Sequence, residues 1–371
     1  MDIEKEPIII DIPLLEEKSE ERKERKSPKK LIPTVAAALL IAFSLLIHSA
    51  IAARACEYLK ENGSELLLSF LIPDYKKSEP MIPPLPEQSE IRGEEEEEFD
   101  FLIRESDLST RAEYGLALTN ETAYTPDLYQ LLGSDRPAPT LPELDRKYGK
   151  DAPKVLIYHS HATEGYADSF GTGFRTKNTD KNVVAIGAIM ARVLERAGIA
   201  TVHVTELFDG ESWSQAYDNS NSAVRTILAK YPSISYVFDI HRDCIGNESE
   251  GYVKATASAF DKDVAQLMFV CGTDEGGSSH TEWRKNLTTA LQLQSNIFSD
   301  REGLMRPVNL RRASFYQDTS PASLILECGT CANTLREAER SAVIFAKELS
   351  DYIIGADSKL DTEHLINTLC P

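Results

Sequence analysis

Histidine and glutamate side chains follow short apolar runs at three places in the second half of this chain. The first run leads into His159, His161 and Glu164, and two later runs lead into His241 and Glu327. Imidazole and carboxylate groups are the usual ligands of a catalytic zinc, which takes three protein ligands and keeps a fourth position for water. The pattern therefore predicts the site of a metal-dependent hydrolase.

The three ligands are expected among His159, His161, Glu164 and His241. An extended segment directs residues two apart to the same side, so we expect His159 and His161 to point together and Ser160 to point away. The residues alone leave open which of the four bind the metal. Any of these assignments leaves Glu327 to act as a general base or acid on the attacking water.

A positive charge next to the second histidine gives a candidate for stabilising the transition state. Arg242 directly follows His241 in the sequence. Arg242 or His159 is expected to stabilise the tetrahedral oxyanion. A simpler alternative is that Arg242 forms an ion pair with Asp243.

The predicted site needs strand ends that meet at one edge of a sheet. Apolar runs alternate with segments of helical spacing from residue 154 onward. The predicted strands are 155–158, 199–204, 234–240, 253–258, 264–270 and 322–326, and the predicted helices are 182–197, 213–230, 281–299 and 334–354. Such alternation predicts an α/β fold with a largely parallel, twisted sheet and helices on both faces. Ligands bind beyond the carboxyl ends of the strands in such sheets.

An apolar run at residues 31–53 predicts a single transmembrane helix ahead of this domain. The run contains no Lys, Arg, Asp or Glu, and as a helix it is long enough to cross about 30 Å of hydrocarbon. Lysine and arginine cluster directly before it, so the positive-inside rule places the N-terminus in the cytoplasm. A cleaved signal peptide is the alternative, although its apolar region is shorter, about 7 to 15 residues.

Four segments follow from this interpretation. Residues 1–30 are expected to be a disordered cytoplasmic tail, and 31–53 the anchor in the cell membrane. Residues 54–114 are rich in Pro and Glu and are expected to form an extended tether. The catalytic domain, with an N-terminal arm, is expected at 115–371 outside the cytoplasm.

Composition excludes one class of partner. The 371 residues carry a net charge of −19, and a chain of that sign without a basic stripe is repelled by phosphate backbones, so we expect no nucleic-acid partner. The six cysteines are too few for the dense disulfide framework of a small secreted domain, and the sequence leaves their pairing open.

Several longer motifs occur in one order between about residue 115 and the C-terminus. They are His159-Ser-His-Ala-Thr-Glu-Gly-Tyr166, Asp239-Ile-His-Arg-Asp243, His280-Thr-Glu-Trp-Arg-Lys-Asn-Leu287, Gly303-Leu-Met-Arg-Pro307, Tyr316-Gln-Asp-Thr-Ser-Pro321 and Leu326-Glu-Cys-Gly-Thr-Cys-Ala-Asn-Thr-Leu-Arg-Glu-Ala338. Together with the predicted anchor, these motifs resemble the stage II sporulation protein P family of spore-forming bacteria.

The resemblance implies a membrane-anchored, zinc-dependent cell-wall hydrolase with an amidase-like fold. Such an enzyme cuts the N-acetylmuramoyl-L-alanine amide bond of peptidoglycan during engulfment, with a possible second endopeptidase activity on peptide crosslinks. It implies His161 and His241 as zinc ligands and Glu327 as the acid/base. Glu164 takes the place of the middle ligand, with His159 as the alternative.

The family also implies partners and a location. Stage II sporulation proteins D and M are the expected partners, and the catalytic domain is expected between the forespore and mother-cell membranes. A non-catalytic peptidoglycan-binding or scaffold protein of the same membrane complex is the alternative function.

Overall fold

The main element of the fold is a sheet of eight strands. A computed structural model describes residues 8–10, 102–169 and 173–370. In spatial order the strands are β1 (Ile8–Ile10), β5 (Thr201–Val204), β4 (Val155–Tyr158), β6 (Tyr236–Asp243), β12 (Ala322–Thr330), β10 (Leu267–Gly272), β11 (Val308–Arg311) and β3 (Leu118–Asn120). The predicted site residues lie at the carboxyl ends of β4, β6 and β12, at the centre of this sheet.

Both sheets of the domain are mixed, which corrects the prediction of a largely parallel sheet. In the main sheet β10 runs antiparallel to β12, while the other neighbouring strands are parallel. A second sheet joins β2 (Ile103–Ser106) in parallel to β8 (Gly251–Ala259), and β7 (Gly246–Asn247) and β9 (Lys262–Ala265) pair antiparallel with β8. No helix separates β6 from β10, so the chain lacks the crossover that parallel pairing requires and reverses by turns instead.

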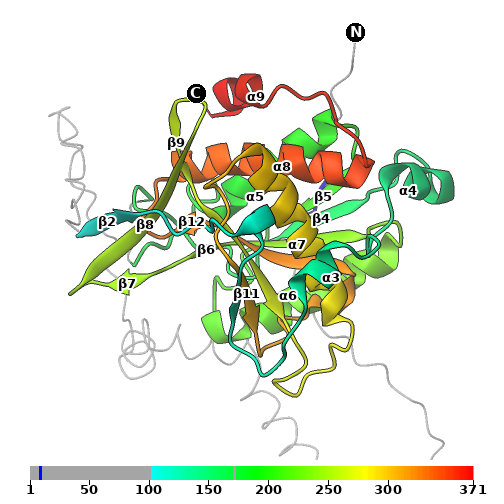
Figure 1. Ribbon diagram of the computed structural model, residues 1–371, viewed down its shortest axis with the longest axis horizontal. Coiled ribbons are helices and arrows are strands. Elements are labelled where there is room, and N and C mark those ends of the chain that lie inside the picture. Colours follow the sequence, from blue (N-terminus) through cyan, green and yellow to red (C-terminus); the bar gives the residue numbers. More distant parts are fainter. Residues whose placement is uncertain (1–7, 11–101, 170–172, 371) are drawn as a thin grey trace, which may run out of the picture. The chain divides into compact units, whose positions relative to one another are not determined.

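Helices cover both faces of the main sheet, as the alternation predicts (Figure 1). One face packs against α5 (Val183–Arg196), α7 (Trp283–Asp300) and α8 (Leu335–Ile354), and the other packs against α6 (Ala216–Lys230). Shorter helices are α3 (Leu128–Leu132), α4 (Leu141–Tyr148) and α9 (Thr362–Leu369). Single 3₁₀ turns occupy η1 (Glu113–Gly115), η2 (Trp213–Gln215) and η3 (Gln317–Thr319).

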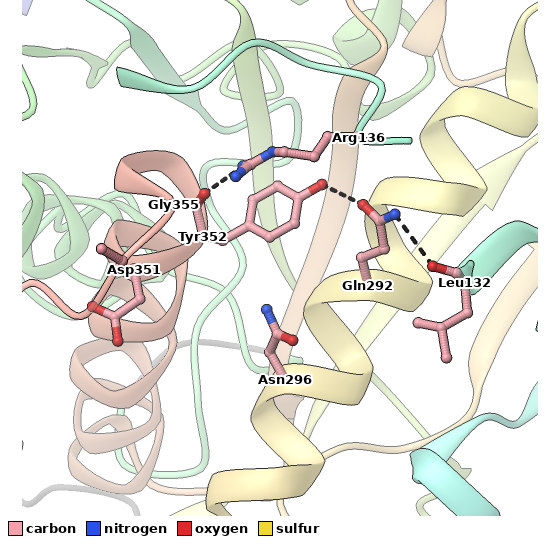
Figure 2. A pocket seen from close by; sticks show the side chains of 8 residues that line it. Leu132, Arg136, Gln292, Asn296, Asp351, Tyr352 and Gly355 are labelled. Atoms are coloured by element: carbon pink, nitrogen blue, oxygen red, sulfur yellow. Dashed lines mark hydrogen bonds between the residues drawn. The ribbon is translucent and has the colours of Figure 1, made fainter. Parts of the chain in front are cut away.

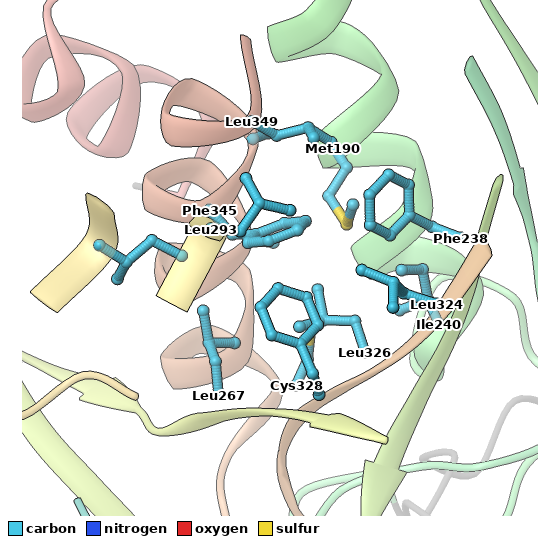
Figure 3. Packing of buried hydrophobic residues seen from close by; sticks show 14 of the residues in the cluster. Met190, Phe238, Ile240, Leu267, Leu293, Leu324, Leu326, Cys328, Phe345 and Leu349 are labelled. Carbon is cyan, nitrogen blue, oxygen red and sulfur yellow. The ribbon is translucent and has the colours of Figure 1, made fainter. Parts of the chain in front are cut away.

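The larger core lies between the sheet and α5, α7 and α8. Phe345 of α8 contacts Phe238 of β6 and Phe269 of β10 edge to face, with ring centroids 5.6 and 5.8 Å apart. Figure 3 shows Met190 of α5 beside the same aromatic cluster. Aromatic pairs in this arrangement add to the hydrophobic gain from burial, so this layer fixes the position of the strands.

Side-chain alternation along the central strands decides which residues reach the site. In β6, Phe238 and Ile240 belong to the larger core, and Val237 packs against α6. Successive side chains of a strand point to opposite faces. His241 therefore projects on the α6 face, as does Glu327, which lies directly opposite it on β12.

The end of the sheet opposite the site is closed by a polar network. The Arg136 guanidinium donates to the carbonyl of Tyr352 and stacks on its ring, with 3.9 Å from Cζ to the ring centroid. The Tyr352 hydroxyl donates to Gln292 at 2.7 Å (Figure 2). A pocket of about 450 Å³ lies here. Because Arg136 also donates to the hydroxyl of Tyr236, the first residue of β6, this pocket is remote from the carboxyl end of that strand.

Most predicted strands and helices from residue 154 onward are confirmed. The structure adds β11, α9 and several short elements that the sequence did not predict. Ile103–Ser106 forms β2, so the last part of the predicted tether belongs to the folded domain.

The predicted anchor at 31–53 lies outside the described residues, and the part of the chain that is described contains no helix long and apolar enough to cross a membrane. Ile8–Ile10, in the predicted tail, pairs with β5. The anchor stays a prediction.

A disulfide joins the ends of the two strands that carry His241 and Glu327. Cys244 follows β6 and Cys331 follows β12, and their Cα atoms are 5.0 Å apart. Cys331 also donates its backbone N–H to the carbonyl of Asp243 at 2.7 Å. Cys271, Cys328 and Cys370 are free and buried. The cross-link holds β6 and β12 together just beyond the site.

Replacing Cys244 and Cys331 by serine is expected to lower the free energy of unfolding by about 2–4 kcal/mol, because the cross-link restricts the unfolded chain. The two residues are 87 positions apart. Urea unfolding of the purified protein measures the change. Dithiothreitol should destabilise the wild type and leave the double variant unchanged. Equal stability of both proteins without reductant contradicts a structural disulfide.

Candidate active site

The polar cluster is organised around His241. Its Nε2 lies 3.0 Å from Oδ1 of Asp239 and 2.8 Å from the hydroxyl of Ser160. On the other side of the ring, Nδ1 lies 3.3 Å from Oε2 of Glu164. All four side chains are buried. Asp239 is two residues before His241 on the same strand, so both side chains share one face, and the carboxylate fixes the orientation of the imidazole.

Glu164 is held by the residue next to His241. The backbone N–H of Arg242 donates to Oε2 of Glu164 at 3.1 Å, and Nη1 of Arg242 lies 3.7 Å from Oε1. The remaining guanidinium donors bind the carbonyls of Gly165 at 2.8 Å and Phe174 at 3.0 Å. Arg242 is buried and committed to these contacts. Arg242 therefore holds Glu164 and the backbone at Gly165 and Phe174, and it is neither a free oxyanion donor nor a partner of Asp243.

His161 lies in the turn that follows β4 and is covered by a tryptophan. The imidazole stacks on Trp213 with ring centroids 3.3 Å apart, and its centroid is 5.4 Å from that of His241. Its buried Nδ1 has no hydrogen-bond partner, and Oδ2 of Asp209 is 4.0 Å away. Arg175 stacks on the same indole, 3.4 Å from Cζ to the ring centroid. His161 thus has a buried nitrogen free to bind a ligand.

His159 lies apart from this cluster. Its Nε2 is 2.9 Å from Nε2 of His203, and its Nδ1 is 3.2 Å from the carbonyl of Ile240. Both histidines pack against Gly187 of α5, where an added Cβ would lie 2.6 Å from either ring. The expectation that His159 and His161 point together is wrong, because β4 ends at Tyr158 and the chain turns. The same turn brings Ser160 to His241, although it was expected to point away.

The protonation states of His161, Glu164 and His241 suit the binding of a cation. Burial, together with the charge of His241, lowers the pKa of His161 to about 4, so its ring is neutral at pH 7. Burial alone would raise the pKa of Glu164, but Arg242 and His241 hold it at about 2. Burial opposes a charge on His241, yet Asp239 and Glu164 raise its pKa well above the usual value. His241 is therefore protonated when no metal ion is bound. The positive charge of its ring then lies beside Glu164, where a bound metal ion would bring its own positive charge.

The donor set formed by His161, Glu164 and His241 fits a zinc ion. Tetrahedral zinc with bonds of about 2.0–2.2 Å separates neighbouring ligand atoms by about 3.4 Å, and Nδ1 of His241 is 3.3 Å from Oε2 of Glu164. Nδ1 of His161 is the unpartnered donor of the cluster. Within the described ranges no three such side chains stand close enough together to hold a metal ion, so a zinc site here would require His161 to move toward the other two.

Glu327 is positioned beside the proposed ligands but does not join them. It pairs across the strands with His241 on one side and Met268 on the other. Its Oε2 is buried and has no hydrogen-bond partner. Burial, with the negative charges of Asp243 and Glu164, raises the pKa of this carboxyl to about 8. A carboxyl that gains and loses a proton near neutral pH is suited to acid/base catalysis.

Asp239, Asp209 and Trp213 belong to the site but were not singled out from the sequence. Asp239 is detectable through its two-residue spacing from His241. Asp209 accepts hydrogen bonds from the backbone and hydroxyl of Thr163, at 3.1 and 2.6 Å, and so holds the turn that carries His161. It follows β5 by five residues, a weak signal. Trp213, in a 3₁₀ turn before α6, carries no local signal for its place over the imidazole.

Comparison with known proteins places this chain in a family. The family model described as stage II sporulation protein P matches residues 75–350. The chain belongs to the stage II sporulation protein P family. Stage II sporulation protein P of Bacillus subtilis (strain 168) is 27% identical over an alignment of 271 residues, and the match covers 66% of this chain and 65% of that protein. The match therefore spans slightly less than two thirds of the length of this family member.

Solved amidase structures align with this member of the family over about half of its length. N-acetylmuramoyl-L-alanine amidase AmiC2 of Nostoc punctiforme is 18% identical with a TM-score of 0.32, covering 54% of this chain and 97% of the amidase. The N-acetylmuramoyl-L-alanine amidase of Clostridium difficile 630 is also 18% identical, with a TM-score of 0.28, covering 55% of this chain and 94% of that one.

The raised pKa of Glu327 predicts a pH-dependent stability difference in metal-free protein. Its pKa of about 8 lies above the usual 4.5, so folding favours the protonated form and stability is lost as pH rises between these values. Glu327→Gln removes that loss. The metal-free variant is expected to match the wild type near pH 4 and to exceed it by about 1–3 kcal/mol near pH 9. Urea unfolding in chelator tests this, and a constant difference across the range contradicts it.

Proposed function

We propose that this chain is a zinc-dependent hydrolase that cleaves the N-acetylmuramoyl-L-alanine amide bond of peptidoglycan. The observation that carries the proposal is the separation of 3.3 Å between Nδ1 of His241 and Oε2 of Glu164, with Asp239 on the far nitrogen of the same ring. A ligating histidine whose other nitrogen meets a carboxylate is the usual arrangement of protein zinc sites. Membership of the stage II sporulation protein P family supports the choice of substrate.

Residues His161, Glu164 and His241 would hold the zinc ion. When bound, zinc supplies Lewis acidity toward the scissile carbonyl and activates a water molecule for attack. Asp239 and Ser160 orient His241, and Arg242 orients Glu164. These contacts fix the ligands before substrate arrives, which lowers the cost of reaching the reactive geometry.

Glu327 moves the proton in this proposal. In its ionised form, Glu327 accepts a proton from the attacking water at the unpartnered Oε2, beside His241, and then donates it to the departing amine. In this proposal Glu327, which transfers the proton, is not one of the three metal ligands. His159 has no part in the reaction, because its ring nitrogens bind His203 and the carbonyl of Ile240.

The proposal extends to the setting of the reaction. Residues 31–53 would anchor the chain in the cell membrane with the catalytic domain outside the cytoplasm. Stage II sporulation proteins D and M would be its partners during engulfment. Peptide crosslinks are a second bond class that the same site would cut, since their scissile bond is also an amide.

Single substitutions separate metal binding from proton transfer. His161→Ala, Glu164→Ala and His241→Ala are expected to lose both zinc and hydrolysis of purified peptidoglycan, because each removes one of three ligands. Glu327→Gln is expected to keep zinc and lose about 10²- to 10⁴-fold in rate. Metal analysis and released amino groups are the measurements.

His364→Ala is the matched control, because His364 is exposed on α9, and it should behave as wild type. Hydrolysis that survives chelation, or zinc that stays bound without His241, rules out the metal site. Zinc binding without turnover in wild type would instead favour a peptidoglycan-binding or scaffold protein.

Membrane topology is tested separately with epitope tags at the two ends of the full chain. Protease added outside intact protoplasts should remove the C-terminal tag and leave the N-terminal tag, because an anchor at 31–53 with basic residues before it keeps the N-terminus inside. Loss of both tags contradicts the anchor.

A further inference from the structure

Arg306 lies beside the site on the side away from His161. Its backbone N–H donates to the carbonyl of Leu267 at 2.8 Å, next to Met268, which is the cross-strand neighbour of Glu327. Its side chain reaches Asp243 at the end of β6, with 2.8 Å between Nη2 and Oδ2. Asp243 is two residues after His241 on one strand. The guanidinium is therefore placed on the face that carries His241 and Glu327.

The Arg306 side chain has an unused donor. It is only 9% exposed, and its buried Nη1 has no hydrogen-bond partner. The acceptor Oε2 of Glu327 is also unpartnered. Arg242 differs, because its backbone and guanidinium groups already bind Glu164, Gly165 and Phe174. Buried polar groups without partners are rare in folded proteins and require an explanation, and a ligand that binds both groups provides one.

The direction of the substrate follows from the proposed role of Glu327, on which this inference rests. Glu327 donates its proton to the departing amine, so the amine side of the scissile amide lies toward Glu327. Arg306 lies in that direction, beyond β12 and next to Leu267 of β10. The acyl side then lies toward His161 and Trp213.

We propose that Arg306 is a specificity-determining residue that binds a carboxylate on the amine side of the scissile amide. Guanidinium groups bind carboxylates through two parallel hydrogen bonds, and Asp243 uses only the Nη2 position. The Asp243 side chain is 26% exposed, so this side of the cluster borders solvent. The substrate class is thus a peptide with a free carboxylate close to the amino group that hydrolysis releases.

Paired substrates test this assignment in the full-length protein. Synthetic muramoyl alanyl-glutamate peptides are compared with the glutamate carboxylate nearest the alanine either free or as the carboxamide. The free acid is expected to have a KM about 10- to 100-fold lower, as for a charge-assisted hydrogen bond. Arg306→Gln should abolish this preference by raising the KM of the acid more than that of the amide.

Two further variants control for folding and charge. Arg336→Gln, which changes a partly exposed arginine on α8 paired with Glu339, should keep the preference. Asp243→Asn removes the carboxylate that Arg306 contacts and should keep or increase the preference for the acid. It tests the assignment even where Arg306→Gln fails to fold, because loss of the preference in Asp243→Asn overturns it.

A binding measurement separates this inference from the proposed hydrolysis. Calorimetry with the alanyl-glutamate dipeptide and its carboxamide needs no turnover, and the acid should bind more tightly to the wild type but not to Arg306→Gln. If neither substrate is cut yet this difference holds, the hydrolase proposal fails and the carboxylate site stands. Equal KM values for acid and amide, or an equal loss on both in Arg306→Gln, overturn the carboxylate site while hydrolysis stands.

Discussion

The parallel pairing of β6 with β12 is the constraint on which the site depends. It sets His241 opposite Glu327 at the carboxyl ends of two buried strands. A slip of one residue would turn either side chain into the core on the α8 side. Directly after this pair the register shifts, so that Arg242 faces both Cys328 and Gly329 before pairing resumes at Thr330. Gly329 has a φ of +75°, and an added Cβ would lie 2.7 Å from that of Ala265, which makes glycine necessary at this bulge.

Burial of so many polar groups is tolerable because each charge has a partner. Glu164 and Asp239 flank His241, and Arg242 balances Glu164. An isolated buried charge would instead neutralise itself or destabilise the fold. Glu327 is the exception, since its free oxygen lacks a donor. Burial and the nearby negative charges raise the pKa of this carboxyl to about 8. Near neutral pH the carboxyl can therefore both hold a proton and release it.

The sequence predicted the central part of the fold well. Apolar runs and helical spacing located the strands and helices around β4, β6 and β12, because buried parallel strands leave a strong local signal. It did not predict β3 and β11, whose three or four residues gain their stability from pairing with distant segments. β10 runs antiparallel to β12 because the chain reverses through turns after β6. Hydrophobic periodicity does not predict such turns.

For the site, the sequence identified the residue types but not every direction. Glu164 lies 3.3 Å from His241, the ring of His161 lies 5.4 Å from that of His241 between centroids, and Glu327 lies opposite His241 on β12. The error at His159 arose from extending strand alternation beyond Tyr158, where β4 has ended. When the alternation of β4 is continued by one residue, His159 falls on the same face as Val155 and Ile157, which face α5. Asp209 and Arg306 reach the cluster from loops, and their contacts depend on tertiary structure that no local pattern encodes.

The stack of Trp213 on His161 gives the molecule an optical reporter of its own site. The chain has two tryptophans, of which Trp283 is 1% exposed in the core and Trp213 is 43% exposed. Indole emission responds to its immediate surroundings, and here those surroundings are the imidazole on one side and the Arg175 guanidinium on the other. A change in tryptophan fluorescence on binding at this site would therefore arise at a single indole, without any attached dye.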